Sequence, residues 1–185
     1  RLRERGSEAP LDLGVRLHSS ISPNAWRTIV YEKGAWVVHM LRRMMGDQRF
    51  FALLSETLRR YDRRSLASDD FQQLAASFLP PRFPDPKLET FFEQWVYSTG
   101  LPSLKLSVSI KGMAPKVTVS GTVRQTDVSR DFSVFVPVEL QFGRGKTETR
   151  WLRTDNEGTQ FTYTFPSAPL KVVLDPNDSV LSLKK

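Results

Sequence analysis

The chain has 185 residues, of which 39% are hydrophobic and 25% charged, and it carries a formal net charge of +7 with no cysteine. The missing cysteines exclude disulfides and thiolate zinc sites, and no apolar run reaches the ~18 residues of a membrane-spanning helix. The positive charge is spread evenly over both halves, which argues against a dedicated nucleic-acid surface. Because the chain starts at Arg1, we expect it to be a part of a longer polypeptide.

Apolar residues recur at helical spacing in the first hundred residues, and this period predicts four helices after an irregular lead-in over residues 1–21. Ser22 and Pro23 suit an N-cap and a first helical position, and Gly46 suits a helix stop. Asp47 and Ser68 are the expected caps of the second and third helices. The expected helices are 23–45, 47–61, one within 65–79 and one within 86–100. Together they indicate a bundle or part of a helical array.

From Pro102 the apolar residues alternate instead, which predicts strands. The expected strands are 104–110, 116–123, 132–142, 147–153, 159–165 and 170–176, with hairpin turns at 143–145 and 155–158. Pro137 lies inside a strand pattern and therefore implies an edge strand or a bulge. The fold class is thus α+β, with an α-helical domain over 1–101 and a small antiparallel β-sandwich over 102–185.

The segment TIVYEKGAWVVHMLRRMMGD, residues 28–47, places Tyr31, Glu32, Lys33 and Gly34 at the head of an apolar helix. By composition alone, this is a helix start with an exposed Glu32–Lys33 pair and a packed Tyr31. Gly34 would allow another backbone or side chain to approach closely. Two further segments follow in order: LETFFEQWVYSTGLPSLKLSV at 88–108 and KVVLDPNDSVL at 171–181.

These three segments together resemble the C-terminal half of the zinc aminopeptidases related to aminopeptidase N and leukotriene hydrolase, the gluzincin group. That family has a Tyr-x-Lys-Gly helix followed by an apolar helix that ends in Gly-Asp or Gly-Glu. A Trp-Val…Thr-Gly-x-Pro junction then leads into a small β domain. The resemblance covers about residues 15–183. It implies that residues 1–101 are the end of a thermolysin-like catalytic domain, here truncated.

The resemblance also implies that Tyr31 is the family's catalytic tyrosine, acting on a peptide substrate. A phenol is a neutral donor that can hydrogen-bond the oxyanion of the tetrahedral intermediate beside the zinc. The zinc site of the family is His-Glu-x-x-His with a later Glu, and its amine anchor is a Gly-x-Met-Glu-Asn-type strand. This chain has only His18 and His39, 21 positions apart, and none of these motifs.

We therefore expect the zinc ligands and the general base to lie in a missing N-terminal half of the catalytic domain. Zinc would belong to the parent protein, and the chain alone would bind no metal and be inactive. The truncated helices should expose an apolar surface, through which the chain could form a homodimer.

Other interpretations stay open at this stage. The chain could be a non-catalytic, peptidase-like scaffold that binds a protein or peptide by strand addition at the Pro137 edge. A nucleic-acid binder rests on the net charge alone. His18 suits a loop and His39 a packed helix position. The basic segment 59–64 suits a solvated helix end better than a phosphate site, and 175–178 suits a turn better than a calcium site.

Overall fold

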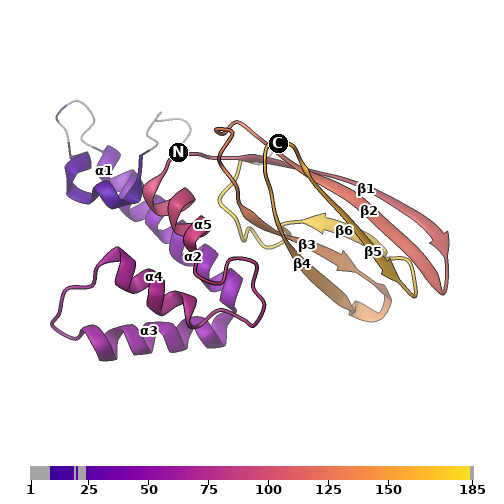
Figure 1. Ribbon diagram of the computed structural model, residues 1–185, viewed down its shortest axis with the longest axis horizontal. Coiled ribbons are helices and arrows are strands. Elements are labelled where there is room, and N and C mark those ends of the chain that lie inside the picture. Colours follow the sequence, from indigo (N-terminus) through magenta and orange to yellow (C-terminus); the bar gives the residue numbers. More distant parts are fainter. Residues whose placement is uncertain (1–8, 19, 21–23, 184–185) are drawn as a thin grey trace. The chain divides into compact units, whose positions relative to one another are not determined.

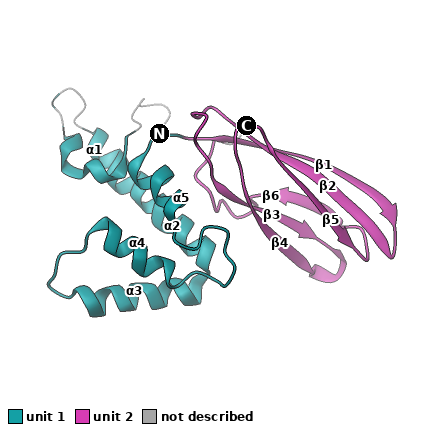
Figure 2. Ribbon diagram, viewed as in Figure 1, with its two compact units in different colours: residues 1–100 teal, residues 101–185 magenta. Residues whose placement is uncertain are grey.

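The chain divides into two compact units, residues 1–100 and 101–185, in a computed structural model that describes residues 9–18, 20 and 24–183 (Figures 1 and 2). The first unit is helical and the second consists of antiparallel sheets, which confirms the predicted α+β class. Within the described ranges, no helix is long and apolar enough to cross a membrane.

Within its described residues, the helical unit consists of a 3₁₀ segment followed by five α-helices and two π-helical segments. They are η1 (Leu11–Leu17), α1 (Ala25–Arg27), the π segment η2 (Thr28–Lys33), α2 (Gly34–Met45), α3 (Asp47–Tyr61), α4 (Ser68–Ala76), α5 (Glu89–Phe92) and the π segment η3 (Glu93–Tyr97). The lead-in is therefore not wholly irregular, because η1 lies within it. The expected cap Ser22–Pro23 lies outside the described residues.

The turn between α2 and α3 explains why Asp47 does not act as the expected cap. Gly46 takes a positive φ of 81° and is itself the N-cap of α3. Asp47 is the first helical residue, and its carboxylate accepts hydrogen bonds from the guanidinium of Arg42 at 2.8 and 2.9 Å. Ser68 is likewise the first residue of α4 rather than its cap, since Ala67 holds the cap position. Both predictions were wrong by one residue.

The core of the helical unit lies between α2, α3, α4 and the α5–η3 helix. Its buried side chains are Ile29, Val37, Met40, Leu41, Met44, Met45, Phe50, Leu53, Leu74, Leu88, Phe91, Phe92, Trp95 and Val96. The proline-rich connection 79–86 is not helical, as predicted. Asp85 within it is buried, and its Oδ2 accepts a hydrogen bond from the backbone N–H of Phe91 at 2.9 Å. This carboxylate thus satisfies a free donor in the first turn of α5.

Over its described residues 101–183, the second unit is a sandwich of two three-stranded antiparallel sheets. One sheet has the order β1 (Ser103–Met113), β2 (Lys116–Thr126), β5 (Thr159–Phe165), and the other has the order β4 (Thr147–Arg153), β3 (Phe135–Gln141), β6 (Lys171–Leu174). The predicted strands 147–153 and 159–165 are confirmed. Alternate residues of β2 and β5 and most of β3 form the core, and the ring centroids of Phe142 and Phe165 lie 5.1 Å apart.

Pro137 is not in an edge strand, because β3 lies between β4 and β6. The carbonyl of Pro137 accepts a hydrogen bond from the N–H of Asp175 at 2.9 Å, so its backbone faces the β6 side of the strand. The strand β6 ends at Leu174, which pairs with Val138. The missing N–H of the proline therefore falls just beyond the ladder, where it interrupts no pairing inside β6. The prediction of an edge strand was wrong, and with it the Pro137 edge as a place for strand addition.

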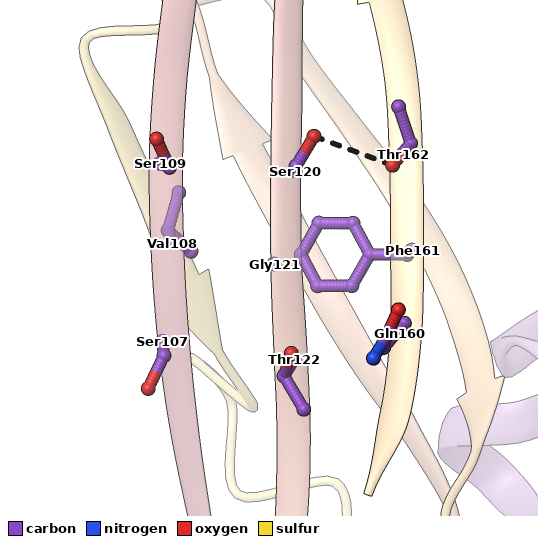
Figure 3. A pocket seen from close by; sticks show the side chains of 9 residues that line it. All are labelled: Ser107, Val108, Ser109, Ser120, Gly121, Thr122, Gln160, Phe161 and Thr162. Atoms are coloured by element: carbon purple, nitrogen blue, oxygen red, sulfur yellow. Dashed lines mark hydrogen bonds between the residues drawn. The ribbon is translucent and has the colours of Figure 1, made fainter.

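The sheet of β1, β2 and β5 has a glycine at its centre where an aromatic ring fills the space of a side chain (Figure 3). Gly121 pairs with Val108 on one side and Phe161 on the other. A Cβ at Gly121 would lie 2.8 Å from Cε1 of Phe161 and 2.7 Å from the carbonyl oxygen of Ser107. The buried Phe161 ring therefore covers the glycine, and no larger residue fits there without a shift of the sheet.

Candidate functional site

The head of the long helix contains a π turn, and this turn positions the candidate catalytic residue. The backbone is helical from Ala25 to Met45, but residues Thr28–Lys33 form π-type hydrogen bonds. A π turn adds one residue to the helix and rotates the side chains on either side of it relative to each other. Such turns occur frequently at functional sites.

The structure reverses the expected environments of Tyr31 and Lys33. Tyr31 is 60% exposed, whereas Lys33 is only 5% exposed. The Nζ of Lys33 donates hydrogen bonds to the carbonyl oxygens of Ala9 at 3.0 Å and Ser98 at 3.1 Å. The prediction of an exposed Glu–Lys pair with a packed tyrosine was therefore wrong for both Lys33 and Tyr31. Instead, Tyr31 presents its phenol to solvent while Lys33 anchors the turn.

Lys33 links three segments that are far apart in the sequence. Ala9 precedes η1, and Ser98 is the C-cap of the second π segment, η3. Carbonyl groups at a helix C-terminus carry a partial negative charge, so an ammonium group is favourable there. The two π segments and the start of η1 are thus tied to one buried cation. This arrangement limits the movement of the backbone that carries Tyr31.

Aromatic contacts orient the ring of Tyr31. The rings of Trp26 and Tyr31 meet edge to face, with centroids 5.4 Å apart and an angle of 63°. The ring centroid of His18 lies 6.4 Å from that of Trp26. Edge-to-face pairs at this distance are favourable beyond their burial. No motif in the sequence identified Trp26, because a tryptophan five residues before Tyr31 has no special meaning in a regular helix.

A mostly apolar groove of about 360 Å³ runs along the same helix. Its lining includes Val30, Gly34 and Val38 from the η2–α2 helix and Leu66, Phe71 and Val96 from later segments. A Cβ built on Gly34 would lie 3.6 Å from Cδ1 of Leu11, an ordinary van der Waals distance. A side chain does approach Gly34, as expected, but the space does not require glycine.

His39 is packed as expected for a helix histidine. It is half-buried, and its ring lies edge to face with Trp36 at 5.6 Å. The candidate calcium turn has a similarly local explanation. The carboxylate of Asp175 accepts hydrogen bonds from the N–H groups of Ser179 at 2.6 Å and Val180 at 3.2 Å. Burial raises the pKa of this carboxyl, and the two amide bonds oppose that rise. A carboxylate that faces amide donors closes a turn rather than binding a cation.

Comparisons with known proteins show what the two units are similar to. Residues 6–95 match the Peptidase family M1 domain, and this range covers most of the helical unit. The chain also resembles the crystal structure of Legionella pneumophila aminopeptidase A in complex with aspartic acid, with a TM-score of 0.60 and 17% identity. The chain is M1 aminopeptidase-like. This confirms the resemblance inferred from the three sequence segments.

The extent of these matches limits what they show. The likeness to the Legionella aminopeptidase covers 87% of this chain but only 18% of that chain, and at 17% identity it shows the fold alone. No curated protein sequence matches the chain significantly. The M1 aminopeptidase-like chain thus spans about a fifth of the length of its structural neighbour, whose activity does not transfer to it directly.

The part of the chain that the structure describes does not fit a zinc site. Residues 9–18, 20 and 24–183 contain no group of three His, Cys, Asp or Glu side chains that could hold a metal ion. Both histidines are described, and each contacts a tryptophan ring: His18 contacts Trp26 and His39 contacts Trp36. Within these ranges, the M1-like helices present an exposed phenol oriented by Trp26 and an apolar groove lined by Val30 and later residues of the same helix.

Proposed function

We propose that this chain is part of a zinc-dependent aminopeptidase that removes N-terminal residues from peptides. The helical unit would be the end of a thermolysin-like, gluzincin-type catalytic domain, and the second unit would be the sandwich that follows it in the sequence. Zinc and the general base would come from residues outside this chain, so the chain alone would be inactive. The exposed phenol of Tyr31, held on a π turn in a segment that matches the M1 domain, carries the proposal.

The role of Tyr31 follows from the chemistry of peptide hydrolysis. Attack of water on the scissile carbonyl gives a tetrahedral intermediate with a negative oxygen. The Tyr31 hydroxyl donates a hydrogen bond to this oxygen. Such a donor is effective when it is already in place, because it needs no reorganisation during the reaction. The ring contact with Trp26 and the bonds of Lys33 to Ala9 and Ser98 supply this order.

The test is a Tyr31→Phe variant in the native polypeptide that contains this chain, assayed on a panel of aminoacyl p-nitroanilides. We expect kcat to fall by about 10²–10³ with little change in KM, as for the loss of one oxyanion donor. The control is Tyr61→Phe, which removes the same hydroxyl from the last residue of α3. Equal activity of Tyr31→Phe and the native protein, or a native protein inactive on the whole panel with zinc present, would refute the proposal.

The exposed apolar side chains of the helical unit point to a covering polypeptide. Val38 of α2 and Phe51 and Leu58 of α3 are exposed, and exposed apolar patches often mark contact surfaces. We propose that the missing half of the catalytic domain covers them, or a second copy when the chain is alone. Light scattering of the 185-residue chain across a range of concentrations tests the second case. A monomer at all concentrations would rule out the homodimer.

A non-catalytic, peptide-binding scaffold is the second candidate function. One observation favours it: β1, an eleven-residue strand, lies at the end of the strand order of its sheet and leaves one edge largely unpaired. An intact peptidase would not need that edge for catalysis. The two functions are compatible, because the edge belongs to the sandwich and Tyr31 to the helical unit.

A further inference from the structure

The strand β1 combines unusual length with an open edge. It pairs with β2 over eleven residues, from Ser103 to Met113, and it ends the strand order of its sheet. Among the described residues, the backbone of the other edge of β1 is paired at one place, an isolated parallel bridge between Ser103 and Leu183, and β6 of the second sheet lies near part of the strand. An open edge of this length presents a row of backbone donors and acceptors.

The bridge shows which backbone groups of β1 face outward. The N–H of Leu183 donates to the carbonyl of Pro102 at 2.8 Å. Backbone groups alternate in direction along a strand, so those of even-numbered residues point to the free edge and those of odd-numbered residues point to β2. Beyond the bridge, the outward groups belong to Leu106, Val108 and Ile110. Gly112, with a φ of 88°, ends the regular edge.

The side chains beside this edge have a distinct chemistry. On the outer face of the sheet, Lys105 and Lys111 flank Ser107 and Ser109 along β1, and all four are exposed. Behind them lies a shallow hollow of about 400 Å³, lined by the hydroxyl and amide groups of Ser107, Ser109, Ser120, Thr122, Gln160 and Thr162 (Figure 3). The outward positions of β1, β2 and β5 add Lys116 and Arg124 and include no carboxylate.

The opposite face of β1 offers apolar contacts. Val108 and Ile110 pair with Gly121 and Val119 on the core side of β2, yet they are 38% and 44% exposed. The second sheet therefore leaves the core side of the β1 edge partly open. A strand added beside β1 would cover these two side chains and gain hydrophobic stabilisation in proportion to the area buried.

We propose that the free edge of β1 binds an extended polypeptide segment by strand addition, and that the segment carries acidic side chains six positions apart. Strand addition supplies backbone hydrogen bonds to Leu106, Val108 and Ile110, and pockets for alternate side chains supply specificity. Side chains on one face of a strand repeat every second residue, so two acids six positions apart reach Lys105 and Lys111, about 20 Å apart. The residues between them face Ser107 and Ser109.

Charge decides against two other occupants. A second copy of β1 paired antiparallel about Val108 would place Lys105 opposite Lys111 of its partner, and like charges directly opposite destabilise a sheet. Single-stranded nucleic acid binds through aromatic stacking as well as charge, and the outward positions of these three strands include no aromatic residue. Lysines on an edge strand also oppose pairing with neutral or basic segments. An acidic segment instead gains ion pairs with the same lysines.

The experiment uses the whole 185-residue chain, labelled with ¹⁵N, and a seven-residue peptide. The peptide has glutamate at positions one and seven, valine at two, four and six, and threonine at three and five. We expect the amides of Leu106, Val108 and Ile110 to gain protection from hydrogen exchange when it binds. The amides of Ser107 and Ser109 serve as internal controls, because β2 already protects them.

Three changes separate strand addition from simple charge attraction. A peptide with lysine in place of both glutamates should bind about two- to thirtyfold more weakly, the range expected for the loss of two exposed ion pairs. The K105E/K111E variant of the protein should restore the affinity for this lysine peptide. A peptide N-methylated at alternate residues should bind at least about tenfold more weakly, because it loses backbone donors. Val108→Pro, with Val108→Ala as its control, removes an outward N–H without touching the β2 ladder.

The outcomes decide between the possible occupants. Alternating protection together with loss on N-methylation supports strand addition. Equal binding of the methylated peptide shows an adventitious charge contact and overturns the proposal. Protection of the same amides without peptide, together with dimerisation in light scattering, would mean that a second copy occupies the edge, and this also overturns it. The methylated peptide keeps the test valid even if Val108→Pro does not fold.

Discussion

Replacement of Lys33 by methionine tests how the helical unit holds its π turns. Methionine has nearly the same shape but no ammonium group, so the carbonyls of Ala9 and Ser98 lose their donor inside the protein. Hydrogen bonds to a charged group contribute about 1.5–3 kcal/mol each. The removal of a buried ammonium also recovers its desolvation cost, which offsets part of the loss. We expect a net decrease of about 2–4 kcal/mol in the free energy of unfolding of the helical unit.

Urea unfolding followed by circular dichroism at 222 nm measures this change, and hydrogen exchange locates it. Exchange should become faster in residues 9–17 and 93–98, while peptides from the sandwich should not change. Lys87→Met is the matched control, because the Lys87 side chain is 77% exposed. Its Nζ forms a surface ion pair with the carboxylate of Glu89 at 3.6 Å. That variant should stay within about 0.5 kcal/mol of the native chain. If Lys33→Met is equally mild, the ammonium does not anchor the turn and the reasoning is wrong.

Three further predictions concern the two glycines Gly121 and Gly34, Glu56 and Asp85. Gly121→Ala should destabilise the sandwich by about 1–3 kcal/mol, because the new methyl group overpacks against Phe161 and the Ser107 carbonyl, whereas Gly34→Ala should be neutral or stabilise the helical unit by up to about 1 kcal/mol. Thermal unfolding of both variants measures these effects, and equal changes in stability would contradict the prediction. Hydrogen bonds from Arg59 and Arg60 lower the pKa of Glu56 from 4.5 to about 2. The carboxylate therefore stabilises α3 above pH ~4.5 and loses this effect as the pH falls toward 2, and a ¹³C NMR titration with a midpoint near 4.3 would disprove it. Asp85→Ala should cost about 1–2 kcal/mol, because the N–H of Phe91 loses its acceptor; an unchanged urea midpoint would show that water replaces the carboxylate.

Periodicity recovered the order of the elements because burial on one side of a helix or strand leaves a direct trace in the sequence. The change from a helical to an alternating period near residue 100 coincides with the boundary between the two units. Residues whose position depends on contacts distant in the sequence left no such trace. Lys33 is buried because Ala9 and Ser98 supply carbonyl acceptors, and nothing near Lys33 in the sequence announces them.

Pro137 shows the same limit in the sandwich. A proline inside a strand pattern predicts an edge, because it cannot donate to a neighbour on its N–H side. In this fold the neighbour on that side, β6, is short and ends at Leu174. The length of one strand thus decides whether a proline fits into the central position of another. Local residue types do not contain this information, whereas the register between the strands does.

The burial pattern along the helix places Lys33 inside and leaves Tyr31 outside. Buried positions along α2 follow an α-helical step from Met45 back through Leu41 and Val37 to Lys33. The same step of four leads to Ile29, which is buried, and Thr28 beside it in the π turn is buried as well. Val30 lines the groove and Tyr31 is 60% exposed, so its hydroxyl can meet a ligand from the solvent side. Because a π turn adds one residue to the helix, an engineered deletion of one residue within 28–32 should convert it into an α-helical turn and misplace the phenol, which links the geometry of this turn to the proposed role of Tyr31.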